Sequence, residues 1–200
     1  MRTYKKYLTA ILITTTAFLV MTGCDKKKPE TDSASPIVMG EKESGGGLTW
    51  NVPVDWTVGQ EKAMRLATYI IKPAGDDTDS AECAVFYFGP EHGGEVDLNL
   101  QRWAGQFEQP DGGNSLDKAE IESEKRDDLK ITTIDLTGTY LVTGAMMQVT
   151  GKKDNYRLLG AIVEGPQGLV FFKMTGPQNT MESAATGFYA LLKSIKPALT

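Results

Sequence analysis

The side chains best suited to bind a ligand are cations and amides that stand inside otherwise apolar segments of the chain. Asn99, Arg102 and Gln106 follow one another at i, i+3 and i+7, so a helix would present all three on one face. If that face met cations on a neighbouring sheet, the group would bind an anion or an anionic partner. The alternative is that these long side chains reach water from half-buried positions and bind nothing. The residues in question are Arg65, Asn99, Arg102, Gln106 and Lys173.

His92 is the only histidine in the chain, which limits the catalytic chemistry that the sequence can support. A Ser-His-Asp triad would have to use it, and the Gly-x-Ser-x-Gly turn that positions the serine of many hydrolases is absent from the sequence. Zinc sites built from several histidines or from paired cysteines are also excluded. Glu91, Glu95 and Asp97 could join His92 as mixed metal ligands, but a polar loop before a helix explains the same residues.

Two acidic groups have residue types that suit oxygen ligands for a cation. The first lacks the spacing and the central glycine of a calcium-binding EF-hand loop. The second alternates along one face of a strand, where solvated charges on an edge strand explain it without a metal. The sequence also contains no glycine-rich nucleotide-binding motif, so we expect neither a metal nor a cofactor. The first group is Asp76, Asp77, Asp79 and Glu82, and the second is Glu120, Glu122 and Glu124.

The amino-terminal segment has the order of an export signal. Basic residues at positions 2, 5 and 6 precede an apolar run from Tyr7 to Met21, and Cys24 follows three residues later. This run is shorter than the about 20 apolar residues that a membrane-spanning helix needs, and its threonines make it less apolar still. We therefore expect residues 1–23 to be a signal peptide that is cleaved before Cys24.

The four residues Met21-Thr22-Gly23-Cys24 resemble the lipobox of bacterial lipoproteins, in which small residues precede a cysteine that is acylated before cleavage. Met21 stands where leucine is usual. The resemblance implies that Cys24 carries acyl chains such as palmitate, and two or more chains anchor a protein stably in a membrane. It implies a place in the bacterial cell envelope, lipid-anchored and facing the periplasm or the exterior. The alternatives are a plain secretory signal and an uncleaved amino-terminal anchor.

The charge balance excludes one class of partner. The chain has 21 basic and 26 acidic side chains, and removal of the three basic residues of the signal leaves 18 minus 26, a net charge of −8. Outside the signal the only basic run is Lys26-Lys27-Lys28, so we expect no nucleic-acid partner. If Cys24 is acylated, Cys83 has no partner for a disulfide, and the apolar run around Cys83 indicates a buried thiol rather than a reactive one.

Composition divides the chain after the signal into two parts. Residues 24–47 are polar and contain three consecutive glycines, which predicts a lipidated amino terminus and a flexible tether. Residues 48–200 have the length and apolar content of a single globular domain. Within it the apolar phase changes between Ile131 and Ile134, which predicts a β-bulge. Strands are predicted at 48–52, 64–72, 82–89, 119–125, 129–142, 146–150, 156–164 and 169–175.

Two segments change to the spacing of an amphipathic helix. One apolar stripe spans 96–107 and includes Trp103, and the second spans 181–195. Asn179 and Glu182 resemble a capping box at the start of the second helix. Strands, a helix, a meander of strands and a terminal helix predict an α+β fold, an antiparallel sheet of about seven strands with two helices packed on it.

This layout resembles the PsbP-like fold, which occurs in extrinsic subunits of photosystem II and in small exported bacterial proteins. The opening run Leu48-Thr49-Trp50-Asn51-Val52-Pro53-Val54-Asp55-Trp56 and the closing helix carry the resemblance. It implies a fold and nothing about a site, because no functional residue of that family can be matched position by position.

The anchor, the tether and the missing catalytic motifs predict a non-enzymatic protein that binds or helps to assemble another component at a membrane surface, with an envelope protein as its partner. Two other hypotheses stay open. One is a hydrolase-like envelope enzyme that uses His92 with nearby carboxylates. The other is a protein that captures an anionic small molecule, which requires Arg65, Arg102 and Lys173 to converge.

Overall fold

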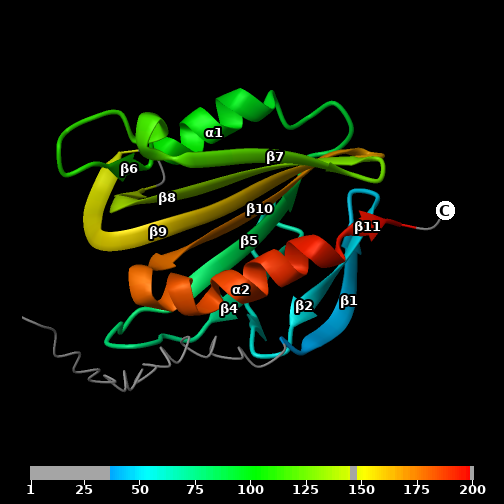
Figure 1. Cartoon of the computed structure of the whole chain (residues 1–200), viewed down its shortest axis with the longest axis horizontal. Coiled ribbons are helices and arrows are strands. Elements are labelled where there is room, and N and C mark those ends of the chain that lie inside the picture. The colour runs from blue at the N-terminus through cyan, green and yellow to red at the C-terminus, as the bar shows by residue number, and fades with distance from the viewer. Residues whose placement is uncertain (1–36, 145–147, 199–200) are drawn as a thin grey trace, which may run out of the picture. The chain divides into compact units, whose positions relative to one another are not determined.

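An eight-stranded antiparallel sheet forms the centre of the fold (Figure 1). The computed structural model describes residues 37–144 and 148–198, and the predicted signal peptide and Cys24 lie outside these ranges. Seven strands follow the order β3-β4-β5-β10-β9-β8-β6, and β7 also pairs with β8. The strands are β3 Thr57–Val58, β4 Ala67–Ile71, β5 Ala81–Tyr87, β6 Phe107–Glu108, β7 Glu120–Arg126, β8 Leu129–Thr143, β9 Val149–Gly165 and β10 Gly168–Pro177.

A smaller antiparallel sheet has the order β1-β2-β11, with β1 Met39–Gly45, β2 Leu48–Pro53 and β11 Lys196–Pro197. Strand β1 falls within the range 24–47 that the sequence assigns to a tether, so the folded body begins before Leu48. The reason is local. Gly46 and Gly47 both have a positive φ, 60° and 74°, which glycine adopts without strain, and they form the two-residue turn of the β1–β2 hairpin.

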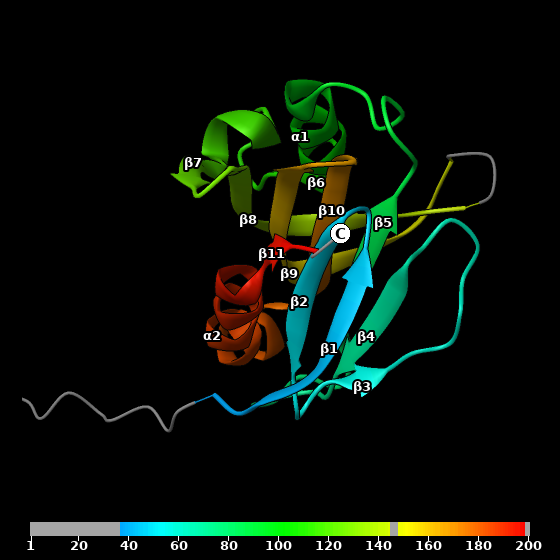
Figure 2. The same ribbon diagram turned by 90° about the vertical axis from the view of Figure 1, so that its right-hand side faces the viewer.

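Two helices cover the large sheet, α1 Val96–Ala104 on one face and α2 Gln178–Ser194 on the other (Figures 1 and 2). A short 3-10 helix, η1 Ser115–Lys118, leads into β7. The first helix ends earlier than the predicted range 96–107, because Phe107 already belongs to β6. The α+β prediction is confirmed. No helix in the described part of the chain is long and apolar enough to cross a membrane.

Because both faces are covered, the sheet separates two hydrophobic clusters. Consecutive residues of one strand enter different clusters, so Leu158 of β9 packs on the α1 side and Leu159 on the α2 side. In β8, likewise, Ile131 faces α2 and Ile134 faces α1. The predicted bulge between these two residues is therefore wrong, since β8 pairs there in regular register with both neighbours. The phase change arises from burial on both sides of the strand.

The amino-terminal end of α2 is capped from a distant loop. The sequence predicts a capping box made by Asn179 and Glu182, but the carboxylate of Asp77, between β4 and β5, accepts the bonds instead. Asp77 accepts a bond from the backbone N–H of Thr180 at 2.6 Å and another from the Thr180 hydroxyl at 2.8 Å. It satisfies a donor that the first helical turn leaves unpaired, and it places negative charge where the helix dipole favours it.

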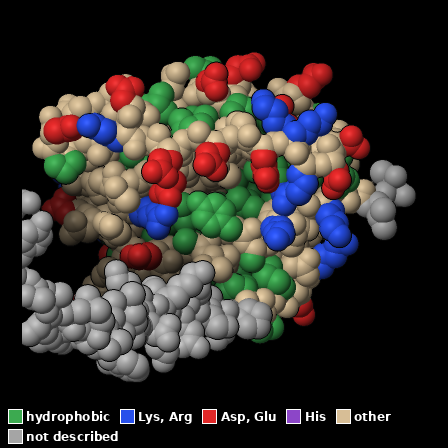
Figure 3. Space-filling model, viewed as in Figure 1, with side chains coloured by type: hydrophobic (Ala, Val, Ile, Leu, Met, Phe, Trp, Pro, Cys, Tyr) green, Lys and Arg blue, Asp and Glu red, His purple; other side chains and the backbone are tan. Residues whose placement is uncertain are grey.

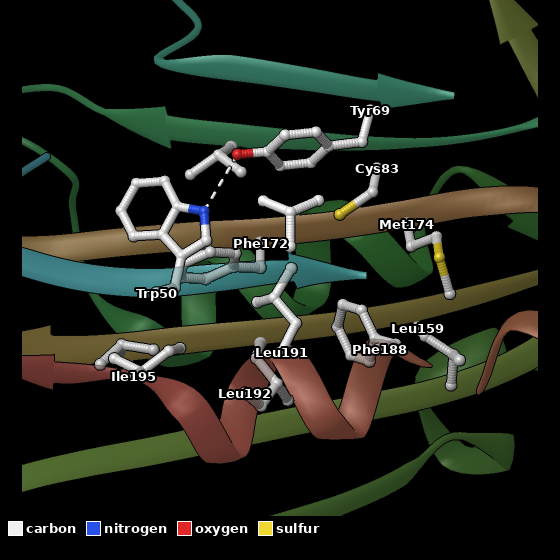
Figure 4. Close-up of a cluster of buried hydrophobic side chains, with 14 of the residues drawn as sticks. Trp50, Tyr69, Cys83, Leu159, Phe172, Met174, Phe188, Leu191, Leu192 and Ile195 are labelled. Carbon is white, nitrogen blue, oxygen red and sulfur yellow. Dashed lines mark hydrogen bonds between the residues drawn. The ribbon is translucent and has the colours of Figure 1, made fainter. Parts of the chain in front are cut away.

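The cluster on the α2 side includes Trp50 of β2 (Figure 4). The indole Nε1 donates a hydrogen bond to the Tyr69 hydroxyl at 3.0 Å, and the ring meets Phe172 edge-on with centroids 5.3 Å apart. Cys83 is fully buried in the same cluster, and burial raises the pKa of its thiol. The thiol therefore packs as a small apolar group, as the sequence indicates.

Candidate functional site

The candidate site is built around Lys173, in the middle of β10. This residue pairs with Ala84 of β5 and with Gly160 of β9. Phe171, two residues earlier on the strand, packs on the α1 side, so the Lys173 side chain points to that side too. There its half-buried ammonium donates a hydrogen bond to Oε1 of Gln106. A lysine thus occupies a position on an interior strand where the neighbouring positions are apolar.

Gln106 reaches Lys173 from just beyond α1 rather than from the helix itself. Its backbone N–H donates to the carbonyl of Trp103 at 3.1 Å, and its own carbonyl accepts from the N–H of Leu141 at 2.8 Å. These two bonds fix the segment between α1 and β6. The prediction that Gln106 continues a helical face is therefore wrong, because the helix ends at Ala104.

Asn99 and Arg102 do share a face of α1, but they have different surroundings. Asn99 is buried, and its Nδ2 donates to the carbonyls of Gly93 and Glu95, both at 2.8 Å. Its Oδ1 accepts a bond from Nη2 of Arg102. Asn99 therefore holds the loop before α1 in place, whereas the exposed guanidinium of Arg102 keeps other N–H donors for a ligand.

Arg65 approaches the same region from the loop before β4. Its Nη1 donates to Oε1 of Glu82 at 2.7 Å and to the Thr68 hydroxyl at 3.3 Å. The guanidinium lies over the ring of Phe86, 5.5 Å from the centroid, which adds a cation–π contact. Lys62 pairs with the other oxygen of Glu82 at 2.6 Å. One carboxylate thus holds two cations at this edge of the sheet.

The charges of Arg65 and Arg102 both act on Lys173. The pKa of the Lys173 ammonium falls from its usual 10.5 to about 8, first because of burial and then because of the positive charges of Arg102 and Arg65. The negative charge of Glu82 raises the pKa of Lys173.

Arg65 contacts Thr68, which lies beside Ala84, the partner of Lys173 across the sheet. Gln106 joins Lys173 to the end of α1, which carries Arg102. The structure therefore places the three cations that the sequence singled out on one part of the α1 side. We call Lys62, Arg65, Arg102 and Lys173 the cationic centre.

A second polar group lies beside the cationic centre on the α1 side. Tyr140 of β8 stacks on Tyr156 of β9, with ring centroids 5.8 Å apart. The Tyr156 hydroxyl donates to Oδ2 of Asp79 at 2.9 Å, and the ammonium of Lys153 reaches the same oxygen at 2.6 Å. Leu141, next to Tyr140 on β8, donates to the carbonyl of Gln106, whose side chain accepts from Lys173, so the two groups are neighbours. Burial raises the pKa of Tyr140, and the charge of Glu82 raises it further. Sequence reasoning missed this group, because no local spacing joins its members.

The cationic centre is suited to bind an oxyanion. A carboxylate or phosphate would accept charge-assisted hydrogen bonds from Lys173 and the two arginines, and partial burial strengthens such bonds. Arg65 and Lys62 already share Glu82, a carboxylate whose charge also acts on Lys173. A cavity of about 590 Å³ at the edge of the sheet is lined by Lys62 and Arg65, so part of the centre borders open space.

The other candidate side chains have different positions. His92 is exposed, with its Nδ1 2.6 Å from the carbonyl oxygen of Pro90, whereas Cys83 is buried in the core, so the geometry gives no support to a hydrolase built on His92. Asp79 pairs with Lys153 as described above. Throughout residues 37–144 and 148–198, no three histidine, cysteine or carboxylate side chains are grouped so that they could hold a metal ion.

Comparison with solved structures identifies the fold. The solution structure of cyanobacterial PsbP (CyanoP) from Synechocystis sp. PCC 6803 is similar, with a TM-score of 0.50 at 11% identity over 84% of this chain and 98% of that chain. The fold is PsbP-like. This match confirms the layout predicted from the sequence and, at such low identity, shows the fold alone.

Two further solved structures are similar at a lower level. A protein from Bacteroides thetaiotaomicron VPI-5482 has a TM-score of 0.42 at 12% identity, over 81% of this chain and 50% of that chain. A protein of unknown function from Pseudomonas aeruginosa has a TM-score of 0.45 at 8% identity, over 83% of this chain and 100% of that chain. No protein-family model and no curated protein matches the sequence.

Proposed function

We propose that this chain is an exported, lipid-anchored protein of the bacterial cell envelope that binds another envelope component without catalysing a reaction. The partner presents an anionic group, a carboxylate or a phosphate, to the cationic centre. The observation that carries this proposal is the position of half-buried Lys173 between Arg65 and the end of α1, the helix that carries Arg102. Arg65 contacts Thr68, which lies beside the partner of Lys173 across the sheet. The lipobox pattern that ends at Cys24 supports the anchor.

The charged form of Lys173 is costly unless something binds to it. Burial and two neighbouring arginines both disfavour its charged form, and Gln106 offers only a neutral acceptor. An oxyanion would reverse the balance, since it supplies opposite charge in a place where water screens little. Perturbed ionisable groups of this kind are typical of functional sites.

A macromolecular partner fits the positions of these side chains. Arg102 and Lys62 are exposed, so a group carried on a larger surface can reach them together with Lys173. Glu82 and the ring of Phe86 already hold Arg65 in place, so its side chain loses little conformational freedom on binding. We therefore favour an envelope protein as the partner, in agreement with the function predicted from the sequence.

The anchor is tested by changing Cys24. Cells that produce the chain would be labelled with a palmitate analogue and fractionated. We expect label on the protein and recovery in the membrane fraction, and we expect both to disappear in Cys24→Ser. A protein released from cells with no label and with an unmodified amino terminus beyond Cys24 would refute the anchor.

The binding site is tested by photo-crosslinking in intact cells. A photoreactive amino acid at Met64, which is exposed beside Arg65, should form a crosslink to one partner protein, whereas the same probe at the exposed Val54 should not. The crosslink should disappear in Lys173→Met. It should remain in Lys118→Met, which makes the same substitution at an exposed lysine on η1. An equal crosslink from both lysine variants would refute the role of the cationic centre.

A second candidate function is capture of a small anion. The half-burial of Lys173 favours it, because a small ligand can enter where a bulky surface cannot. Native mass spectrometry of protein purified from cells distinguishes the two. A bound anion that is lost in Lys173→Met, together with no crosslink at Met64, would favour the small molecule over the protein partner.

A further inference from the structure

The outer edge of β7 is the longest regular strand edge that the large sheet leaves open. This strand pairs with β8 over all seven residues, Glu120–Arg126, with no register shift, and in the described structure no strand pairs with its other side. Six of its residues are exposed and the seventh is half-buried. Figure 2 shows β7 at the outer margin of the fold. Its outward N–H and C=O groups are therefore available to another strand.

Several other edges of the fold are short or irregular, unlike β7. Strands β3, β6 and β11 have only two residues each, which leaves little backbone to pair. Strand β1 is long, but its register shifts between Met39 and Lys42, and its charges alternate in sign. Strand β7 is longer than the two-residue strands and pairs in regular register, and its first five residues carry only acidic charge.

Glu120, Glu122 and Glu124 alternate along β7 and therefore point to one side of the sheet. That side is the α2 side, because Glu124 pairs with Ile131, which packs in the α2-side cluster. Figure 3 shows acidic side chains in a row along β7. A hollow of about 380 Å³ between that strand and α2 is lined by Glu122, Glu124 and Tyr189 of α2.

The glutamates make few ion pairs within the described structure, although Arg126 and Lys193 line the same hollow as Glu122 and Glu124. Glu124 lies 3.8 Å from Arg126, and neither Glu120 nor Glu122 makes an ion pair with any described residue. Like charges two residues apart on a strand face repel one another, so the row favours a cationic neighbour. A second copy of the chain, paired in the symmetric register centred on Glu122, would instead set glutamate against glutamate.

We propose that the free edge of β7 binds an extended segment of another protein, which adds to the sheet as a further strand and carries lysine or arginine at alternate positions facing Glu120, Glu122 and Glu124. The backbone bonds supply attachment, and the alternation of charge supplies specificity. The site is independent of the cationic centre, because it has the opposite charge and lies on the other side of the sheet.

The probe is a short peptide in which lysine alternates with valine and threonine. It is titrated into 15N-labelled protein that has been purified in its exported form. We expect binding to shift the backbone amide signals of residues 120–126 and to slow hydrogen exchange at the outward N–H groups of β7. Two control peptides define the mode. One has the same composition with its lysines contiguous, and the other has N-methylated backbone amides. Each should bind about tenfold more weakly than the alternating peptide.

The matched variants are Glu122→Lys on the edge and Glu61→Lys on the exposed loop before β4. Because Glu122 is exposed, its replacement leaves the fold intact, which circular dichroism checks. We expect Glu122→Lys to weaken binding about tenfold and Glu61→Lys to leave it unchanged. Equal binding of all three peptides, signal shifts outside β7, no binding, or a β7-mediated dimer of the protein would each overturn the proposal.

Discussion

Replacing Lys173 by methionine should make the protein more stable, although most changes at a partly buried position destabilise a fold. Methionine has a similar length and keeps the packing on β10, but it removes the charge that burial and two arginines disfavour. The fall of the Lys173 pKa from 10.5 to about 8 corresponds to about 3 kcal/mol of destabilisation at neutral pH.

Part of this gain is lost again, because Gln106 would no longer have the ammonium as a partner. The loss of such a hydrogen bond costs about 1 kcal/mol. The net gain is about 2 kcal/mol, and for a domain of this size each kcal/mol raises the melting temperature by about 2 to 4 °C. We therefore expect Lys173→Met to melt about 4 to 8 °C above the wild type at neutral pH.

The dependence on pH separates charge from packing. Below the folded-state pKa of about 8, both states hold the proton and the destabilisation by Lys173 is fully present. As the pH rises from about 8 to 10.5, the folded protein releases this proton while the unfolded chain keeps it, so the wild type gains stability and the destabilisation is lost. The variant lacks this gain, so the difference between the two proteins should shrink.

The assay is thermal and urea denaturation of both proteins at about pH 7 and about pH 10. Other titrating groups cancel in the difference between the two proteins, so that difference is the quantity to measure. Lys118→Met is the control, since Lys118 is an exposed lysine paired with Asp111. A variant at Lys173 that is less stable than wild type at neutral pH, or a difference that does not change with pH, would refute the reasoning.

Three further predictions concern the core and the cap. Trp103→Ala should destabilise the protein by about 3 to 5 kcal/mol in urea denaturation, because the indole is buried beneath α1. Asp77→Ala should cost about 1 to 2 kcal/mol by the same measurement, because α2 loses the carboxylate that caps Thr180. Cys83 should react with a thiol reagent only after urea unfolds the protein, since burial raises the pKa of its thiol.

Each of these predictions has an outcome that contradicts it. An unchanged urea midpoint in Trp103→Ala would mean that α1 does not pack on the sheet as described. If Asp77→Ala leaves the urea midpoint unchanged, the carboxylate does not act as a cap, even if Asp77→Asn lowers that midpoint. Rapid labelling of Cys83 in the native protein would show that the α2-side cluster opens to solvent.

The sequence predicted the parts of the fold that depend on local periodicity. Helix α2 repeats its apolar residues at helical spacing over four turns, and only burial against a sheet explains that pattern. The change of phase between Ile131 and Ile134 misled the prediction, because burial on both sides of a strand and a bulge give the same local pattern. Likewise Gly46 and Gly47 suit a linker and a tight turn equally, and only the pairing of β1 decides between them.

The members of the candidate site were singled out from the sequence, but their arrangement was not predicted. Arg65 and Lys173 were identifiable because each is a cation within an apolar run, yet their proximity depends on the pairing of β4 with β5 and of β5 with β10. In the sequence Glu82 belongs to the acidic group that contains Asp79, whereas in the structure its carboxylate accepts a hydrogen bond from Arg65. The capping of α2 by Asp77 could not be predicted from local sequence either, because Asp77 and Thr180 are 103 positions apart.

The two proposed sites can be tested separately because their charges are opposite and the sheet lies between them. Lys173→Met removes a cation on the α1 side and leaves the edge of β7 untouched, whereas Glu122→Lys changes that edge and leaves the cationic centre intact. If one partner engages both surfaces, each change alone should weaken binding, and the free-energy losses should add, since the two residues share no contact. If the two surfaces serve different partners, each variant should lose one crosslink and keep the other.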